Sequence, residues 1–382
     1  MKRYDYVVVG AGLSGCCMAN LLSAKGNKVL IIEKRSHIGG NIFDKVDDET
    51  GIIVQQYGPH IFHTNDEKVY NYITKFSIWE KFILKCGVEI DGIFTPSPFN
   101  FKTIDQFFNS NEIKENLLKE YPNDKTVTIV ELLNSKNEII KKYAEFLFDK
   151  DYSLYTAKQW GIKPSEVDVN VLKRVPVRLD YNEMYFTDKY QIMPKYGFTE
   201  VITEMIKSNN IDIYLERDFL KYISFKDCKL TIDLPGAENA KVIYTGPIDA
   251  LFNYKYGLLP YRSLDFIYKK FENTIQEYPV VAYPSAIGYT RITDYSLLPL
   301  QNGSGTIVAE EYPKKYTLDS KTDPYYPINN EVNDSIYQRY YEEAKKYSNL
   351  ILCGRLSLYK YYNMDQIIRY CLDLYEDLNK DE

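Results

Sequence analysis

The sequence predicts an α/β protein in which a parallel-sheet domain is combined with a helical domain and an antiparallel β-sheet domain. Three observations lead to this prediction. A buried strand, a glycine-rich turn and an apolar helix follow one another at the N-terminus, and apolar residues recur at helical spacing between residues 103 and 148. Short β-branched and aromatic runs, interrupted by Pro and Gly, occupy residues 174–190 and 241–312. The length of 382 residues leaves room for two or three domains.

Composition narrows the class of protein. Hydrophobic residues make up 45% and charged residues 26%, the balance of a soluble globular chain. The net charge of −6 argues against nucleic-acid binding, and no apolar run approaches the roughly 20 residues that span a bilayer. Six cysteines without a C-x-x-C pair and only three histidines predict reduced thiols and no metal site. No secretory signal precedes the first strand, so we expect a cytoplasmic protein.

The first element is a strand over residues 4–9, followed by a glycine turn and a helix that continues to Leu22. The turn carries Gly10, Gly12 and Gly15 in the G-x-G-x-x-G pattern, and a second strand over residues 28–32 ends at Glu33. Gly10 allows the tight turn, Gly12 lets backbone approach a pyrophosphate, and Gly15 permits close packing of helix on strand. Glu33 is placed to bind ribose hydroxyls. This combination predicts a dinucleotide site at a helix N-terminus.

A second glycine pair selects the dinucleotide. Lys34 leads to Gly39, Gly40 and Asn41, directly after the ribose carboxylate. This resembles the glutathione-reductase-like FAD fold, in which such glycines let the chain pass beside the pyrophosphate. Near the C-terminus, a strand, Gly354-Arg355 and a tyrosine-rich helix resemble the segment that approaches the flavin in that fold. We therefore expect an FAD-binding, Rossmann-like domain over residues 1–78, 196–245 and 331–382.

The rest of the chain forms two further domains in this prediction. The helical periodicity places a helical domain at residues 101–165. Residues 79–100, 166–195 and 246–330 are expected to form an antiparallel sheet that binds the substrate.

Nine segments, in order along nearly the whole chain, resemble the UDP-galactopyranose mutase family. They are YGPHIFHTN at 57–65, YTAKQWG at 155–161, KRVPVR at 173–178, YF at 185–186, TGPID at 245–249, YRSL at 261–264, YTRI at 289–292, DPYYP at 323–327 and YKYY at 359–362.

The resemblance implies a redox-neutral interconversion of a nucleotide-linked pyranose and furanose, which supplies furanose for surface polysaccharide. In this family reduced FAD provides the nucleophile, N5, that attacks the anomeric carbon and displaces the nucleoside diphosphate. The implied partners are a nucleoside-diphosphate sugar and an external electron donor such as NAD(P)H or a reductase, and the implied assembly is a homodimer.

The resemblance also implies roles for individual residues. Arginines suit a departing diphosphate because their planar fork can hold phosphate oxygens. The expected roles are a diphosphate clamp for Arg174 and Arg291, phosphate-binding hydroxyls for Tyr185, Tyr325 and Tyr361, and uracil binding for Tyr155, Thr156 and Gln159. The resemblance further places Trp160 at the pocket floor beside a mobile loop of the helical domain, and His60, His63 and Arg355 close to the flavin. His63 is the third catalytic candidate, although a hydrogen-bonded structural role is equally compatible with its position. Tyr361 and Tyr362 are adjacent, so on a helix their side chains would diverge by about 100° and only one is expected to reach a ligand.

Two positions depart from the family pattern on the sugar side. Leu84 stands where many members carry a sugar-facing Asn, and Asn363 stands where Asp usually follows the paired tyrosines. A buried galactose hydroxyl left unpaired at Leu84 would cost about 1 to 3 kcal/mol. The same chemistry on a 6-deoxyhexose, a 6-deoxyheptose or an N-acetylhexosamine is therefore an alternative.

Two other classes of function stay open at this point. An oxidoreductase of the amine-oxidase type shares the N-terminal flavin signature and would reduce its FAD in air when substrate is added. A nucleotide-sugar binding module without catalysis would give no product even with reduced flavin.

Overall fold

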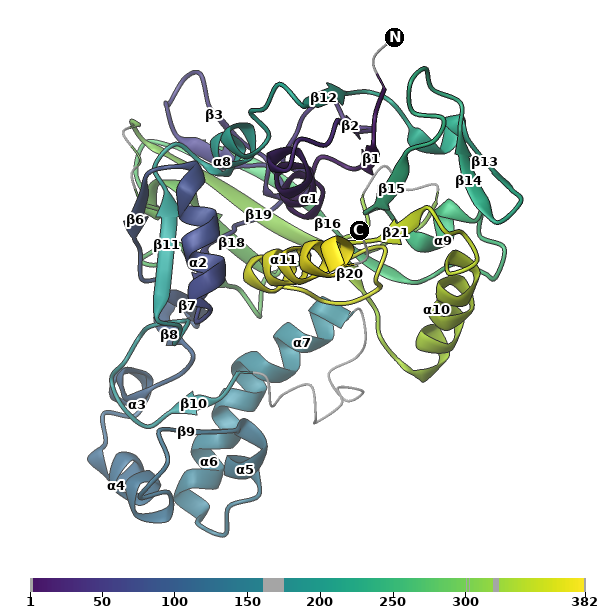
Figure 1. Ribbon diagram of the computed structural model, residues 1–382. Coiled ribbons are helices and arrows are strands. Elements are labelled where there is room, and N and C mark those ends of the chain that lie inside the picture. The colour runs from purple at the N-terminus through teal and green to yellow at the C-terminus, as the bar shows by residue number, and fades with distance from the viewer. Residues whose placement is uncertain (1–2, 161–174, 300, 302, 319–322, 381–382) are drawn as a thin grey trace.

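The computed structural model describes residues 3–160, 175–299, 301, 303–318 and 323–380 (Figure 1). Its centre is a five-stranded parallel sheet in the order β12-β2-β1-β15-β21. The strands are β1 (Tyr6–Val9), β2 (Val29–Ile32), β12 (Ile211–Tyr214), β15 (Lys241–Tyr244) and β21 (Leu350–Leu352). They come from three separate stretches of the chain, so the sheet assembles both ends and a middle segment. The predicted α/β fold with a Rossmann-like parallel sheet is confirmed.

Both faces of the parallel sheet are covered, because its strands are apolar on both sides. Val8 packs into the core beneath α1 (Leu13–Ala24), α8 (Phe198–Met205) and α11 (Met364–Lys380). Val7 and Val9 point to the opposite face, toward α9 (Ile248–Leu251), α10 (Glu331–Ala344) and the hairpin of β13 (Ile223–Lys226) and β14 (Lys229–Ile232). Burial on both faces is typical of parallel sheets.

A seven-stranded sheet in the order β20-β16-β19-β18-β17-β7-β8 forms the second part of the molecule. Its strands are β7 (Cys86–Ile90), β8 (Ile93–Ser97), β16 (Tyr261–Phe271), β17 (Val280–Ala282), β18 (Arg291–Asp294), β19 (Thr306–Lys315) and β20 (Tyr326–Pro327). All its pairs are antiparallel except β17 with β7, where Val280 is aligned with Cys86 in parallel. The sheet is therefore mixed rather than fully antiparallel.

Three segments expected in this sheet lie elsewhere, at residues 79–81, 177–178 and 190–194. Residues 190–194 form β11, which pairs with β5 (Phe62–Thr64) and β6 (Trp79–Lys81) in a separate three-stranded sheet. Residues 177–178 form β10, which pairs with β9 (Thr126–Val127) inside the helical part. Such short strands carry too little pattern to reveal their partners.

The helical part projects from the two sheets in Figure 1 and contains α3 (Phe101–Phe107), α4 (Asn111–Glu120), α5 (Ile129–Leu133), α6 (Glu138–Leu147), the π-helical turn η3 (Phe148–Tyr152) and α7 (Ser153–Trp160). Side chains cap the helix starts, as the Asn100 and Thr128 capping boxes show. Its core is built from residues such as Ile104, Leu117 and Tyr143. The helix α7 leads from this core back to the sheets.

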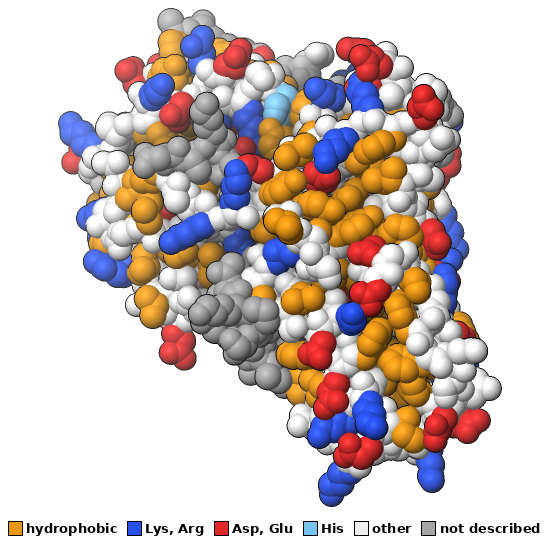
Figure 2. All heavy atoms as spheres, turned by 180° about the vertical axis from the view of Figure 1, so that it is seen from behind, with side chains coloured by type: hydrophobic (Ala, Val, Ile, Leu, Met, Phe, Trp, Pro, Cys, Tyr) orange, Lys and Arg blue, Asp and Glu red, His pale blue; other side chains and the backbone are white. Residues whose placement is uncertain are grey.

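The remaining elements are α2 (Glu67–Ile73) and the hairpin of β3 (Asp44–Val46) and β4 (Ile53–Gln55). Seen from behind, charged side chains of both signs are interspersed over the surface (Figure 2). Within the described part of the chain, no helix is both long and apolar enough to cross a bilayer.

Candidate active site

A cavity of about 1300 Å³ lies between the parallel sheet, the seven-stranded sheet and α7. Its wall includes the turns after β1, β2 and β15, which are the carboxyl ends of parallel strands. Ligands of open α/β sheets bind at this edge. The other walls come from strands β16 to β19, the β20 segment, residues 355–364 and the start of α7. One cavity therefore joins the predicted cofactor and substrate segments.

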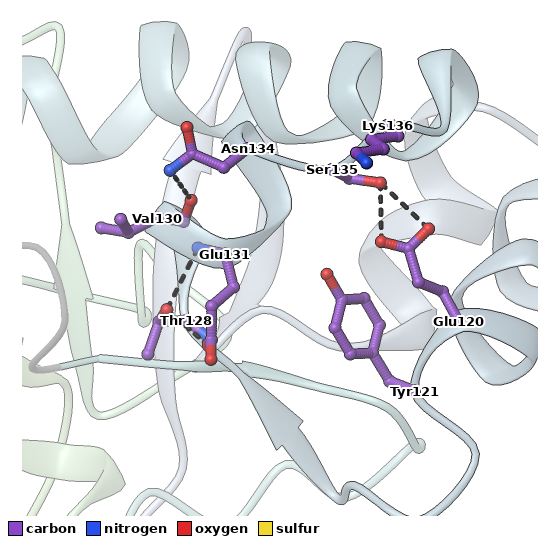
Figure 3. Close-up of a pocket in the computed structure, with 8 residues that line it drawn as sticks. All are labelled: Glu120, Tyr121, Thr128, Val130, Glu131, Asn134, Ser135 and Lys136. Carbon is purple, nitrogen blue, oxygen red and sulfur yellow. Dashed lines mark hydrogen bonds between the residues drawn. The ribbon is translucent and has the colours of Figure 1, made fainter.

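A second pocket lies within the helical part and shares no lining residue with this cavity (Figure 3). Several of its polar groups are already hydrogen-bonded as helix caps and turns. Thr128 and Glu131 form a capping box, and Ser135 Oγ donates to the Glu120 carboxylate at 2.8 Å. This pocket contains none of the predicted site residues.

The first glycine turn is packed too tightly for side chains. Gly10 has φ +101°, and a Cβ there would lie 2.3 Å from Thr245 Oγ1. A Cβ on Gly15 would lie 2.0 Å from the Gly10 carbonyl oxygen, so the helix start rests directly on the turn. Gly10 lines the cavity, whereas Gly15 packs beneath it. The predicted division of roles between these glycines agrees with this geometry.

The second glycine pair closes against the first turn. Gly40 has φ +56°, and a Cβ on it would approach Gly12 Cα to 2.8 Å. Gly39 is bridged to Gly12, and Asn41 lines the cavity beside them. Two stretches of bare backbone thus face the cavity side by side, as a cradle for a pyrophosphate requires.

Glu33 is a buried carboxylate at the end of β2. One oxygen accepts the backbone N–H of Ala11 at 2.8 Å and the other accepts that of Arg35 at 2.8 Å. A carboxylate has about four acceptor positions, so capacity remains for the hydroxyls of a ribose in the cavity that Glu33 lines.

A charged cluster flanks this carboxylate. Arg35 Nη2 lies 2.5 Å from an Asp323 oxygen and 3.0 Å from Asn41 Oδ1, while its guanidinium covers the Tyr57 ring at 4.5 Å. Lys34 Nζ lies 3.3 Å from the other Asp323 oxygen. Asp323 belongs to the segment before β20, so the cluster ties the cofactor side to the substrate side.

The C-terminal approach differs in part from the prediction. Gly354 has φ +105°, and a Cβ would lie 2.8 Å from Ser14 Oγ, so it packs under the first turn. Arg355 lines the cavity and lies over the Tyr326 ring at 5.0 Å. The expected tyrosine-rich helix does not start here, because α11 begins at Met364. Tyr361 and Tyr362 therefore lie in a loop, and both line the cavity. The helical 100° argument was wrong for this pair because the backbone is not helical there.

These residues fit FAD. The glycine cradle would hold the pyrophosphate, Glu33 and Lys34 would hold the adenosine side, and Arg355 with the start of α11 would face the flavin. A bound FAD supplies redox or nucleophilic chemistry at its isoalloxazine ring.

His60 lines the cavity in its neutral form. Its Nδ1 lies 2.8 Å from the Gly58 carbonyl oxygen, so Nδ1–H donates and Nε2 is left as an acceptor. Burial, and the positive charge of Arg355, lower the pKa of His60 to about 4. His60 is thus a hydrogen-bonding group rather than a charge at neutral pH.

His63 also lines the cavity but is held by its neighbours. Its Nδ1 lies 2.9 Å from an Asp188 oxygen, and its ring stacks on Phe186 at 3.6 Å between centroids. These contacts fix the orientation of the ring, which suits a positioning role at least as well as the predicted catalytic one.

Arg291 is the best-defined cationic group of the substrate side. It lies opposite Glu311 in the register of β18 and β19, and its Nε and Nη2 both lie 2.7 Å from Glu311 Oε2. Burial opposes the charge of this guanidinium, but the Glu311 carboxylate outweighs that effect and raises the pKa of Arg291. The remaining N–H groups of the fork can bind an anion in the cavity that Arg291 lines.

The tyrosine hydroxyls are distributed differently from the prediction. Tyr185 and Tyr361 line the cavity, as expected of phosphate-binding residues. Among the described residues, however, Tyr326 lines it and Tyr325 does not. Tyr325 is buried with its ring 6.4 Å from Tyr57, whereas Tyr326 stacks on Tyr361 at 5.4 Å. Neighbouring residues of an extended chain point to opposite sides, so the hydroxyl that reaches the cavity belongs to Tyr326.

Tyr155 and Thr156 of α7 line the cavity. Lys158, on the same helix, donates from Nζ to the carbonyl oxygens of Tyr283 at 2.8 Å, Ala286 at 2.6 Å and Tyr289 at 2.9 Å. These carbonyls belong to the loop between β17 and β18. Lys158 therefore fixes α7 against the loop that leads into Arg291.

The two departures from the family pattern are both in the cavity wall. Leu84 is buried, and its carbonyl accepts the backbone N–H of Tyr185 at 2.8 Å. Leu84 belongs to one apolar cluster with Cys86 and Val280, which also line the cavity. Asn363 directly precedes α11 and donates its N–H to Gln366 Oε1 at 2.9 Å.

Three predicted residues lie wholly or partly outside this description. Arg174 lies outside the described residues, as do the side chains of Gln159 and Trp160.

Conversely, the sequence interpretation missed Glu311, Tyr326, Lys158 and Asp323. A signal existed for Lys158, which follows Tyr155 by three positions on one helix. Glu311 could be found only from the register of two strands.

Comparison with known proteins places these observations in a family. A family model described as UDP-galactopyranose mutase matches residues 150–361, and one for an NAD(P)-binding Rossmann-like domain matches residues 8–76. The UDP-galactopyranose mutase of Mycoplasma genitalium is 37% identical over 378 residues, covering 96% of this chain and 93% of the relative. The dTDP-fucopyranose mutase of Escherichia coli is 32% identical over 385 residues, covering 98% and 99%.

Solved structures agree on the fold. A crystal structure of reduced UDP-galactopyranose mutase aligns with a TM-score of 0.67 at 13% identity, covering 100% of this chain and 95% of the other. Putrescine oxidase bound to putrescine aligns with a TM-score of 0.54 at 13% identity, covering 99% of both chains. At such identities the likeness to the oxidase shows a shared fold and no more.

Proposed function

The chain belongs to the UDP-galactopyranose mutase family, and from this premise we propose that it interconverts UDP-galactopyranose and UDP-galactofuranose. The coarser activity, a flavin-dependent exchange of pyranose and furanose forms of a nucleotide-linked sugar, follows from family membership. The observation that carries the proposal is Arg291, held by Glu311 in the same cavity as the two glycine turns. When bound in its reduced form, FAD supplies the nucleophile for the anomeric carbon.

The protein's task in this reaction is to hold the diphosphate while it is separated from the sugar. Arg291 is fixed by Glu311, so its remaining N–H groups can meet phosphate oxygens without reorganisation. The hydroxyls of Tyr185, Tyr326 and Tyr361 line the same cavity and can donate to those oxygens. Arg174 is proposed as the second cation of the clamp on the KRVPVR motif alone.

The nucleoside is proposed to bind along α7. Tyr155 offers an aromatic face in the cavity and Thr156 a hydroxyl beside it. Gln159 and Trp160 follow on the same helix and are proposed as further contacts from the motif. With the nucleoside held by α7 and the diphosphate by Arg291, the sugar at the other end of the substrate is directed toward the cofactor side of the cavity.

A second candidate substrate is a nucleotide-linked 6-deoxyhexose, and a specific observation favours it. Leu84 and its neighbours make an apolar wall, which suits a sugar methyl group better than a hydroxyl. The dTDP-fucopyranose mutase relative is nearly as similar as the UDP-galactopyranose mutases. The two candidates share every step except the sugar contact.

The test is to incubate the FAD-loaded protein, with and without dithionite, with UDP-galactofuranose and with dTDP-fucofuranose, and to separate the products by chromatography. We expect conversion to the pyranose only after reduction, with no net consumption of reductant and with the galactose compound turned over fastest. Faster conversion of the fucose compound would transfer the proposal to the 6-deoxy sugar. Flavin reduction by an amine in air, without sugar conversion, would contradict both.

Two partners belong to the proposal as well. NAD(P)H or a reductase is the proposed source of the electrons, and a homodimer is the proposed assembly. Anaerobic bleaching of the bound flavin by NAD(P)H and light scattering of the purified protein would test them separately.

A further inference from the structure

Asp188 stands behind the cavity wall, and none of the roles above uses it. It belongs to residues 185–189, which lead from the cavity into β11. Both of its carboxylate oxygens are bonded: Oδ2 lies 2.9 Å from His63 Nδ1, and Oδ1 accepts from Asn65 Nδ2 at 2.8 Å. The Asn65 side chain is fixed in turn, because its Oδ1 accepts the backbone N–H of Lys189 at 2.8 Å. Asp188 is therefore a fixed carboxylate at the Nδ1 edge of His63.

The surroundings of His63 leave one edge of its ring open. The Nδ1 edge meets Asp188, and one ring face stacks on Phe186 with 3.6 Å between centroids and 15° between planes. The backbone of His63 is held by its pairing with Gln191 in β11. The side chain is 16% exposed and lines the cavity, and among the described residues Nε2 has no hydrogen-bond partner. The edge of the ring that meets the cavity is therefore the one that carries Nε2.

The carboxylate decides which nitrogen of His63 carries the proton. A carboxylate only accepts, so Nδ1 carries the N–H, and in the neutral ring Nε2 is then an acceptor. His60 has the same tautomer, but its Nδ1–H meets the neutral carbonyl of Gly58. A full negative charge behind Nδ1–H increases the electron density at Nε2 more than a carbonyl dipole does. Of these two histidines, His63 therefore offers the stronger acceptor to the cavity.

We propose that Asp188 is a positioning residue, which holds His63 as the Nδ1–H tautomer so that Nε2 accepts a hydrogen bond from an N–H or O–H group of the reactants. The inference rests on the proposed function, which brings reduced FAD and a nucleotide-linked sugar into the cavity. Two donors share this chemistry, an N–H of the reduced flavin ring and a hydroxyl of the sugar. An acceptor that is already oriented stabilises its donor without the cost of turning the ring.

The first measurement is a ¹⁵N NMR spectrum of the FAD-loaded protein labelled in its histidine rings, at a pH where histidine is neutral. The chain has only three histidines, so His63→Gln assigns the His63 signals. We expect a protonated Nδ1 and an unprotonated Nε2 at His63 in the wild type. Asp188→Leu has a similar size and no acceptor, so it should move the proton toward Nε2 while the His60 signals stay in place. An unchanged His63 tautomer in Asp188→Leu would overturn the inference.

Two further measurements identify the donor. If the reduced flavin donates, Asp188→Leu should lower the reduction potential of bound FAD by about 30 mV, which corresponds to a tenfold change for a two-electron couple. If the sugar donates, the potential should stay the same, and calorimetry on the oxidised protein should show about tenfold weaker binding of UDP-galactose with unchanged binding of UDP. Unchanged potential and unchanged affinity for UDP-galactose, despite an altered tautomer, would leave Asp188 without this role and reject the inference.

Two control variants keep the test valid. Asp188→Asn retains the shape and one acceptor oxygen opposite two donors, His63 Nδ1–H and Asn65 Nδ2–H, so it should give mixed tautomers and an intermediate effect. It serves in place of Asp188→Leu if that variant does not fold. Glu80→Gln removes an exposed carboxylate from β6 of the same sheet, and it should leave the tautomer, the potential and the affinities unchanged.

The controls also separate this inference from the mutase proposal. An effect of Glu80→Gln as large as that of Asp188→Leu would indicate a general effect of charge and contradict a specific role for Asp188. Failure of the wild type to bind UDP and UDP-galactose would contradict the mutase proposal, whereas the tautomer and the potential would still test Asp188.

Discussion

The cofactor side and the substrate side of the cavity are built from different materials. The cofactor side is mostly backbone, supplied by glycines and one carboxylate within residues 10–41. The substrate side is made of side chains from β18, β19, the β20 segment, α7 and the loop before α11. Backbone cradles depend on residue type at fixed spacing, whereas a side-chain constellation depends on how distant segments are aligned. Substitutions in the cofactor half should therefore reduce FAD binding, whereas substitutions in the substrate half should reduce turnover or substrate affinity.

The largest effect is expected on the substrate side. Arg291→Ala should lower turnover about 10³-fold, since it removes the fixed cation from a developing diphosphate charge, while FAD stays bound. Sugar conversion is followed by chromatography and FAD by its absorbance. The substitution also leaves Glu311 buried without its partner, so Arg291→Ala/Glu311→Gln keeps the test valid if the single variant is unstable. Near-normal turnover in both variants would remove Arg291 from the clamp.

The cofactor side can be broken separately at Gly40. Gly40→Ala should lower the FAD content of the purified protein at least tenfold, because its Cβ would lie 2.8 Å from Gly12 Cα and its φ is +56°. Gly92→Ala is the matched control, since Gly92 also has positive φ, +85°, but open space around it. That variant should lose only about 1 kcal/mol of stability and keep its FAD. Full FAD occupancy in Gly40→Ala would contradict the cradle.

A smaller effect should appear where α7 meets the sheet. Lys158→Met removes three hydrogen bonds to the loop that leads into Arg291, and we expect KM to rise about tenfold with a lesser change in kcat. Lys345→Met, which loses an exposed pair with Glu342, should leave both constants unchanged. A drop in kcat with an unaltered KM would argue against a role for Lys158 in positioning the nucleoside.

The last prediction concerns stability rather than activity, at His60 between the two halves. Its pKa is about 4 in the folded protein against an ordinary 6.5, so the unfolded chain binds more protons between these values. The wild type should therefore lose unfolding free energy as the pH falls from about 6.5 to about 4. His60→Asn can keep the bond to the Gly58 carbonyl, and urea titrations across this range should show a flatter dependence. Parallel curves for the two proteins would show that His60 does not titrate in this way.

The same contrast explains what the sequence could reveal. Gly10, Gly40 and Glu33 were found because spacing alone defines their task, and the structure joins them in one cavity. Tyr325 was preferred to Tyr326 because the motif does not say which of two neighbours faces inward. The loop at Tyr361 was taken for helix, since periodicity cannot place a helix start that follows an irregular turn.

Glu311 shows the limit most clearly. It lies 20 positions from Arg291 in the chain, and only the register of β18 on β19 brings the two together. The mixed order of the seven-stranded sheet was missed for the same reason. Nothing in the sequence near Val280 indicates that β17 pairs in parallel with β7. In both cases the arrangement depends on the pairing of strands that are distant in the sequence.

Asp323 connects the cofactor half of the cavity to the substrate half. Its side chain is held by Arg35 and Lys34 beside the glycine cradle, and it stands three residues before Tyr326 in the substrate wall. Any change that binding on one side makes in affinity on the other is matched by an equal change in the reverse direction, since such linkage is reciprocal. Nucleotide affinities should therefore be compared at saturating FAD, so that any such linkage is the same in every measurement.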